Sequence, residues 1–380
     1  MASERDSIVR RKAEFQEKGI RIPPKLVVEL EANYNAPAIG TGRMVLCLES
    51  PLGNGELVPV FIVNGKRAAF SPYLLSINNE GKFEVWKESK KYAEVCFLPR
   101  PKFYNQTTSG NVSMSKVAVI VGPGHLRSVA NQRCTYQQTG QPCKFCAVQH
   151  WWNAITIKQS IQISETVEAG FKEGAVKHIS LTTATLDTPD RGLANLVEAA
   201  KLIRERTNVP IMIEFEPVTD HALLTGLLEE AKKAGVTTVS INVECFDEKL
   251  REEIMPAKGK ISIGEYLKNW EIGLDLFGKN QVSTVAVVGI GEEDKSTIDG
   301  VEMAASLGVM TFLVPHSPAI GAVFEDMAPP SADRMLHLYK KAVDIFKKSN
   351  LDLGASIAGC VRGGGFSAIK DVARFGFSDK

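Results

Sequence analysis

Three cysteines in one short stretch are the residues of this chain best suited to chemistry. Cys134, Cys143 and Cys146 lie in the segment CTYQQTGQPCKFC, and Phe145 directly precedes the last of them. Three soft thiolate ligands on one loop predict a metal site. A four-iron cluster held by three cysteines keeps one iron open to bind a small molecule, whereas a structural metal site takes a fourth protein ligand.

A zinc site is the main alternative, because His150 follows Cys146 closely and would complete a Cys₃His tetrahedron. Zinc knuckles, however, usually have paired two-residue spacings and occur in small domains, whereas this loop opens a large one. The pattern therefore favours an iron–sulfur cluster over zinc. A non-catalytic iron–sulfur protein is a further alternative.

Composition limits the possible partners. The chain has 380 residues, and its 45 basic side chains nearly balance its 44 acidic ones, so no net field favours nucleic acid or an anionic membrane. The N-terminus is charged and no apolar run follows it that would suit a signal peptide or a membrane span. Seven cysteines, an odd number, argue against a disulfide framework. We expect a cytoplasmic protein with a small-molecule substrate and without nucleic-acid or membrane partners.

The sequence changes character near residue 115. Residues 1–115 predict an N-terminal α+β extension, with a helix at 4–18 and β-rich runs at 25–30, 43–48 and 58–63. Residues 116–380 instead repeat apolar strand, loop and amphipathic helix at intervals of roughly 30 residues, which is typical of βα units with parallel strands. The predicted fold is an α/β, partial (β/α)₆ TIM-type barrel that ends in a glycine-rich segment.

Six strands and six helices are predicted for the barrel. The strands are expected at 117–121, 178–182, 211–216, 238–242, 283–288 and 311–314, and the helices at 165–172, 194–206, 223–234, 264–276, 295–307 and 332–348. A seventh element is expected at 352–357. Loops at the carboxyl ends of barrel strands build the active site, and the cysteines follow the first predicted strand.

The cysteine loop and the βα domain together resemble the radical S-adenosylmethionine (SAM) superfamily over residues 115–370. The commonest family spacing has three residues between the first two cysteines, whereas here residues 135–142 intervene; the second half, with Phe145, matches. The resemblance implies a [4Fe-4S] cluster held by Cys134, Cys143 and Cys146, with SAM on the fourth iron. Phe145 would pack beside the adenine, and residues 135–142 would form an extended loop over the cluster.

The same resemblance implies an oxygen-sensitive enzyme. Reductive cleavage of SAM would give a 5′-deoxyadenosyl radical that acts on a small-molecule biosynthetic substrate, with electrons from a low-potential donor such as flavodoxin or ferredoxin. A fainter resemblance, carried by the cysteine spacing and the run Cys-Val-Arg-Gly-Gly-Gly at 360–365, is to a small branch found beside nitrilase genes in bacteria. That branch implies a nitrile precursor or an amino-acid-derived substrate.

Polar side chains cluster at the predicted strand ends. Asn242 and Glu244 share a face with Ser240, and a polar row inside a barrel must be satisfied by a ligand or by water. This row resembles the SAM ribose site of biotin-synthase-like members. Glu214 and Glu216 share a face of the third strand, where they would hold the methionine ammonium or the substrate, or pair with a nearby Lys or Arg.

Other candidates have weaker support. The family often has Gly-Gly-Glu after the second strand, and here Thr182 and Thr183 would substitute. Lys258 is a candidate for the SAM carboxylate, with a solvated charge as the alternative. Gly289 and Gly291 resemble the glycine-containing strand that packs under adenine.

Two candidates come from the last part of the chain. His316 would orient the substrate or contact SAM, unless it is structural. Cys360, in the glycine-rich segment, would donate hydrogen to a substrate radical, unless it is only a buried thiol. The glycines beside Cys360 would hold a carboxylate or phosphate, or form a flexible turn.

Overall fold

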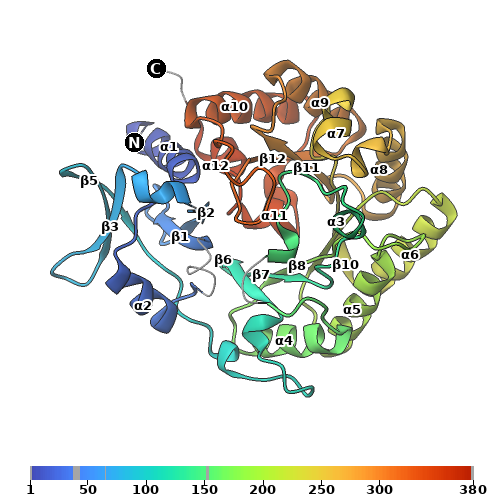
Figure 1. Cartoon of the computed structure of the whole chain (residues 1–380), viewed down its shortest axis with the longest axis horizontal. Helices are drawn as coiled ribbons and strands as arrows, with labels where there is room; N and C mark the ends of the chain where they lie inside the picture. Colours follow the sequence, from blue (N-terminus) through green and yellow to red (C-terminus); the bar gives the residue numbers. More distant parts are fainter. Residues whose placement is uncertain (1, 37–42, 65, 151–153, 378–380) are drawn as a thin grey trace.

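A curled sheet surrounded by helices forms the body of the molecule in the computed structural model (Figure 1). The structure describes residues 2–36, 43–64, 66–150 and 154–377. The strands of this sheet, in spatial order, are β12 (Met310–Pro315), β11 (Val282–Val288), β10 (Val236–Ile241), β9 (Ile211–Phe215), β8 (His178–Thr182), β7 (His125–Val129) and β6 (Val119–Gly122).

Each strand from β7 to β12 pairs in parallel with the next along the chain, and only β6 pairs antiparallel, with β7. Helices between the strands cover the outside of the sheet (Figure 1). They are α4 (Ser160–Lys172), α5 (Leu193–Arg206), α6 (His221–Lys233), α7 (Glu248–Ile254), α8 (Ile263–Phe277), α9 (Asp294–Leu307) and α10 (Ala332–Lys348). The predicted partial (β/α)₆ barrel is confirmed, with β12 and β6 as the two edges of the sheet.

The helices begin where the sequence supplies side-chain caps. Asp220, Asp247, Ser262 and Ser331 each accept a hydrogen bond from a backbone N–H in the first turn of the following helix. Among the helices of the described ranges, none has the length and apolar character to cross a bilayer.

Some predicted elements were wrong. The first parallel strand is β7, whereas the prediction of 117–121 falls mostly on antiparallel β6. Strand β7 was missed because His125 and Arg127 make it polar, and those side chains face inward. The run at 25–30 lies in helix α2 (Pro24–Asn33), whose Pro24 suits the first helical turn. The seventh element is one short 3₁₀ turn, Leu353–Ala355.

The N-terminal part contains α1 (Ala2–Lys18), α2 and two small antiparallel sheets, so the smaller α+β part is confirmed. The sheets are β1 (Arg43–Glu49) with β2 (Leu57–Val63), and β3 (Tyr73–Ile77) with β4 (Phe83–Lys87) and β5 (Lys90–Val95). Side chains such as Phe15 and Val60 share one apolar core with Phe312 and Tyr339 of the barrel. The proposed boundary at residues 115 and 116 stays a prediction.

The glycine-rich segment fills the inside of the barrel. Helix α11 (Gly359–Gly363) lies near the middle of the ring of strands and contacts β8 and β9 (Figure 1). A Cβ at Gly359 would lie 1.9 Å from Met212 Sδ, and one at Gly363 would lie 2.4 Å from His125 Nδ1. These glycines therefore allow α11 to pack closely against the strands. We call residues 359–366 the plug. They do not form the flexible turn considered from the sequence.

Helix α1 holds the plug in place. The buried Lys12 ammonium donates to Gly364 O at 2.8 Å and pairs with Asp371 of α12 (Ile369–Phe375) at 2.7 Å. Phe61 N of β2 donates to Gly365 O at 2.9 Å. The start of the chain is therefore tied both to the end of the plug and to the last helix.

Two stacked histidines lie beneath the plug. The rings of His125 and His178 are 4.4 Å apart, His125 Nε2 lies 2.6 Å from Ser180 Oγ, and Gly359 N donates to His178 Nδ1 at 3.2 Å. Burial lowers the pKa of both imidazoles, that of His178 to about 3. Both rings are therefore neutral in the folded protein at neutral pH.

Replacing the first plug glycine should destabilise the fold. Gly359 has φ of 86°, and Gly359→Ala adds a methyl group where Met212 already lies, so we expect a loss of about 3 kcal/mol in the free energy of unfolding. Gly226→Ala is the matched control: this exposed position in α6 is open, and alanine there should stabilise by roughly 0.5–1 kcal/mol. Urea unfolding measures both, and equal effects would contradict the packed plug.

Acidification should destabilise the protein through the histidine pair. Between pH 6.5 and 3 the unfolded chain binds a proton at His178 that the folded protein does not. The free energy of unfolding therefore decreases as the pH is lowered. Through His178, the free energy of unfolding should be about 1.4 kcal/mol lower at about pH 5.5 than at about pH 7.5, with a further decrease through His125. His178→Gln should reduce this pH dependence, whereas His337→Gln, at an exposed position of α10, should keep the wild-type dependence.

Candidate active site

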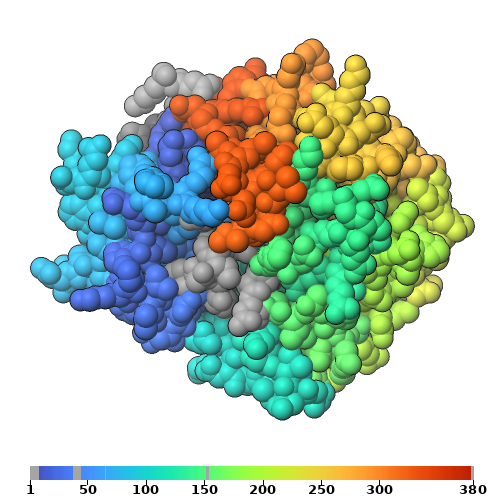
Figure 2. Space-filling view, viewed as in Figure 1, coloured from blue at the N-terminus to red at the C-terminus, as the bar shows by residue number. Residues whose placement is uncertain are grey.

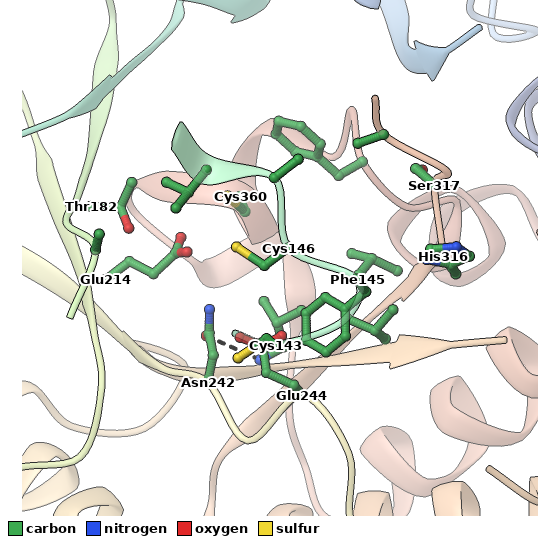
Figure 3. A pocket seen from close by; sticks show the side chains of 18 of the residues that line it. Cys143, Phe145, Cys146, Thr182, Glu214, Asn242, Glu244, His316, Ser317 and Cys360 are labelled. Atoms are coloured by element: carbon green, nitrogen blue, oxygen red, sulfur yellow. Dashed lines mark hydrogen bonds between the residues drawn. The ribbon is translucent and has the colours of Figure 1, made fainter. Parts of the chain in front are cut away.

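A cavity of about 350 Å³ opens at the carboxyl ends of the strands. Its wall combines the cysteine loop after β7, the ends of strands β8 to β12, the plug, and Gln16, Phe61 and Val63 of the N-terminal part. Figure 3 shows side chains from the cysteine loop, the strand ends and the plug around one space. Loops and strand ends thus meet where parallel barrels carry their active sites.

The cysteine loop is fixed at both ends. Thr135 N donates to Thr185 O after β8 at 2.9 Å, and Lys144 N donates to Ile254 O of α7 at 2.8 Å. Part of the predicted extended loop is a helical turn, α3 (Thr135–Gln138).

The segment between β12 and α10 covers this loop. Phe324 N donates to Lys144 O at 2.8 Å, and Ala319 and Ala322 pack on Ala147. Figure 2 shows this covering segment in orange at the centre of the face, beside the green of the cysteine loop.

All three cysteines are free thiols and line the cavity. Figure 3 shows the sulfurs of Cys143 and Cys146 on the side of Glu214 and Asn242. Burial raises the pKa of both thiols, that of Cys146 to about 11, while the Lys258 ammonium acts to lower that of Cys143. Among the described residues, no three or more His, Cys, Asp or Glu side chains are already gathered as a site for a metal ion.

The donor set fits a thiolate-held cluster. Three soft donors reach the wall of one cavity, and a buried cation, Lys258, lies close enough to favour the thiolate form of Cys143. His150 is exposed in a 3₁₀ turn (Val148–His150) and packs on Gly321, outside the cavity wall. Its position therefore does not support the Cys₃His alternative.

A polar row continues from the end of β10. Ser240 Oγ donates to Asn242 Oδ1 at 2.8 Å, and the same oxygen accepts from Val285 N at 3.2 Å. These bonds hold the Asn242 carbonyl against the sheet, and Figure 3 shows its amide nitrogen on the cavity side. Glu244 follows with φ of 64°, a conformation that non-glycine residues rarely adopt.

Glu244 pairs with Lys258 at 3.1 Å, and both side chains are largely buried. Burial lowers the pKa of Lys258, but the charge of Glu244 and other nearby groups outweighs burial and raises it well above the usual value. Lys258 is therefore a cation in the cavity wall, not the solvated charge considered from the sequence.

The two carboxylates at the carboxyl end of β9, Glu214 in the strand and Glu216 just after it, have different partners. Glu216 accepts hydrogen bonds from Tyr136 Oη at 2.5 Å and Thr185 Oγ1 at 2.9 Å. Glu214 lies 3.3 and 3.4 Å from Arg127 Nη2 of β7. Burial and the charge of Glu216 raise the pKa of Tyr136, so its phenol keeps the proton that it donates.

Arg127 is the main residue that sequence analysis missed. Its guanidinium lies within the barrel, where Nη1 donates to Cys360 Sγ at 3.1 Å and the charge lies over the Phe366 ring at 5.5 Å. Burial raises the pKa of Cys360 to about 11, so this thiol is protonated. Leu126 and Val129 on either side of Arg127 were the available signal, but β7 was not recognised as a strand because His125, Arg127 and Ser128 make it polar.

The remaining candidates divide into two groups. Phe145, Thr182, Thr183 and His316 line the cavity. Burial lowers the pKa of His316, whose Nε2 lies 3.3 Å from Phe324 O, and Figure 3 shows this ring beyond Phe145, away from Glu214.

Gly289 and Gly291 lie outside the cavity wall. Gly289 has φ of 95° and packs on Pro330, and Gly291 has φ of 115° beside Leu250. Both glycines adopt the positive φ angles that this turn requires. The Glu292 carboxylate stabilises the turn by accepting a hydrogen bond from Gly289 N at 2.7 Å. A contact with adenine stays a prediction.

Comparison with known proteins identifies the fold that carries this cavity. Residues 131–304 match the model of the Radical SAM superfamily. This part of the chain belongs to the radical SAM superfamily. The resemblance seen in the cysteine loop is thereby confirmed, and the matched residues belong to a superfamily of enzymes. The radical SAM match runs from the cysteine loop to α9, whereas β12 and the plug, which line the same cavity, lie beyond it.

Individual relatives are distant. The chain is 23% identical over 235 residues to bacteriochlorophyllide c C-7(1)-hydroxylase of Chlorobaculum limnaeum, covering 57% of this chain and 58% of that protein. Methylornithine synthase is a similar structure, with a TM-score of 0.46, 16% identity, and coverage of 59% of this chain and 62% of the other. A cobalamin-dependent radical SAM enzyme, OxsB, has a TM-score of 0.35 and 13% identity over 71% of this chain and 36% of its own. The chain thus spans less than two thirds of each.

Breaking the ion pair in the radical SAM cavity should destabilise the protein. Lys258→Met leaves Glu244 as a largely buried charge, so we expect the free energy of unfolding to fall by about 3 kcal/mol. Lys260→Met changes an exposed lysine two residues away and should stay within about 0.5 kcal/mol of wild type. Chemical unfolding at neutral pH separates the two, and similar values would contradict the buried pair.

Proposed function

We propose that this protein is a radical SAM enzyme that holds a [4Fe-4S] cluster with Cys134, Cys143 and Cys146. It would cleave SAM reductively to start radical chemistry on a small-molecule biosynthetic substrate. The observation that carries the proposal is the placement of three free cysteines in a cavity at the strand ends of a radical SAM barrel. A reduced cluster, when bound, supplies the electron that splits SAM into methionine and a 5′-deoxyadenosyl radical.

The polar groups of the cavity offer partners for each end of SAM. Lys258, the cation that acts on the Cys143 thiol, is available to the methionine carboxylate. Asn242 and Glu244 would bind the ribose hydroxyls, because one presents an amide and the other a carboxylate at the end of β10. Phe145 is the aromatic surface available to adenine. Thr182 and Thr183 lie on the same wall, at the end of β8.

Glu216 is the best partner for the methionine ammonium. Its hydrogen bonds come from the neutral hydroxyls of Tyr136 and Thr185, so its charge is stabilised without a cation among these partners. A buried carboxylate of this kind favours a cationic ligand. Glu216 thereby takes the place of the acid of the Gly-Gly-Glu motif, which β8 lacks.

The cavity also suits reactive intermediates. Apolar side chains such as Phe145, Val287 and Phe312 dominate its wall, and the segment between β12 and α10 covers the cysteine loop. Excluding water prevents side reactions of a radical. An electron donor such as flavodoxin or ferredoxin, a cytoplasmic location, and a nitrile precursor or amino-acid-derived substrate are parts of the same proposal.

Anaerobic reconstitution with iron and sulfide tests the proposal. Wild-type protein should bind four irons per chain and, with SAM and dithionite, release 5′-deoxyadenosine. Cys143→Ala should lose the cluster absorption and this cleavage. Cys96→Ala removes a free cysteine outside the cavity and should keep both.

Two results would contradict the proposal. Colourless protein that binds zinc after reconstitution would show a zinc site. A bound cluster without release of 5′-deoxyadenosine would show a non-catalytic iron–sulfur protein.

A further inference from the structure

We propose that the inner end of the cavity binds the substrate, and that the substrate is a small α-amino acid held as a zwitterion between Arg127 and Glu214. This inference rests on the proposed function and adds the substrate class to it. The inner end is formed by Arg127 and Glu214 together with Cys360, Phe366, Phe61 and Gln16, all in the cavity wall. None of these residues is needed for the cluster or for the SAM partners proposed above.

The ion pair at the inner end is loose. Arg127 Nη2 lies 3.3 and 3.4 Å from the two oxygens of Glu214, whereas hydrogen bonds between ionised groups usually measure roughly 2.7–2.9 Å. Both side chains are largely buried, with exposed fractions of 9% and 14%. A ligand can therefore enter between the two charges without breaking an optimal contact.

Charge balance selects the class of ligand. Burial lowers the pKa of Arg127, but the charge of Glu214, the neighbouring Cys360 and the hydrogen bonds to both together outweigh burial and raise it, so Arg127 is a cation beside Glu214. An anion alone would place a second negative charge beside Glu214, and a cation alone would place a second positive charge beside Arg127. Buried like charges without compensation are costly. A zwitterion brings a carboxylate to Arg127 and an ammonium to Glu214 and keeps the site neutral.

The surroundings favour an apolar side chain on that amino acid. Phe366 lies under the Arg127 guanidinium at 5.5 Å, and Phe61 lies 4.5 Å from Phe366. Phe312 and Val314 continue the same wall toward the mouth. Contact with Phe366 also limits the orientations of the guanidinium, which suits bidentate recognition of a carboxylate.

The position of the pair separates substrate from cofactor. Glu214 and Glu216 point to the same side of β9, and two residues of a strand span about 7 Å. Glu216 contacts Tyr136 of the cysteine loop, whereas Glu214 contacts β7, deeper in the barrel. A substrate at the inner pair would therefore lie against the side of SAM that faces the barrel interior.

Ligand binding to the anaerobic, reconstituted protein with SAM present tests the inference. Calorimetric titration with the common L-amino acids should find one that binds. Its decarboxylated amine and its deaminated acid should each bind at least about tenfold more weakly, because each adds one uncompensated charge. The inference is overturned if no amino acid binds, or if either analogue binds as tightly as the parent.

Variants distinguish a binding pair from a structural one. The double variant Arg127→Gln/Glu214→Gln removes both charges together, so neither is left alone in the barrel. It should unfold at a similar denaturant concentration, keep SAM cleavage by dithionite, and lose amino-acid binding by about tenfold or more. Glu216→Gln should show the opposite pattern, with weaker SAM binding and retained amino-acid binding.

The two proposals fail in different ways. If the wild type releases 5′-deoxyadenosine but binds no amino acid, the substrate class is wrong and the radical SAM activity stands. If it binds neither SAM nor a cluster, the proposed function itself is wrong. A double variant that folds and binds the amino acid as wild type does would show that the Arg127 and Glu214 pair is only structural.

Discussion

Largely buried ionised side chains in the wall of one cavity impose the constraint on which the rest of the site depends. Arg127, Lys258, Glu214, Glu216 and Glu244 all line that cavity. A buried charge is tolerated only beside an opposite charge or several hydrogen bonds. Two ion pairs and a carboxylate bound by hydroxyls meet this requirement. Each ion pair, and the carboxylate bound by hydroxyls, also presents a charged or polar group to a ligand. The same contacts therefore stabilise the buried charges and prepare them for binding.

The plug determines how deep the cavity is. An open βα barrel without it would leave the inner faces of β7, β8 and β9 exposed, with the histidine pair among them. Close packing at Gly359 and Gly363 fills this space up to Cys360, and the cavity begins there. The interior of the barrel thus has three layers. The plug and the histidine pair are the innermost, Arg127 and Glu214 form the middle one, and the cysteines lie nearest the mouth of the cavity.

Local patterns allowed most of this architecture to be predicted. Helix 332–348 and strand 178–182 agree with the structure residue for residue, because apolar periodicity and clear caps define them. Strand β7 and Arg127 were missed because inward-facing polar residues hide the strand pattern. Helix α2 was read as a strand because its Leu and Val run suits both. The partners of Glu214 and Glu216 come from distant parts of the chain. Sequence patterns are local, so they could not tell which partner belongs to which carboxylate.

The bond between Lys12 and Gly364 joins residues 352 positions apart in the chain. Ribosomes add roughly 5–20 residues per second, so Lys12 leaves the ribosome roughly 20–70 s before its partners exist. During that time the first helix lacks its buried counter-ion, and the barrel lacks its plug. Placing the plug and pairing Lys12 with Asp371 therefore wait for the end of synthesis, so the base of this active site depends on a contact of very long sequence separation.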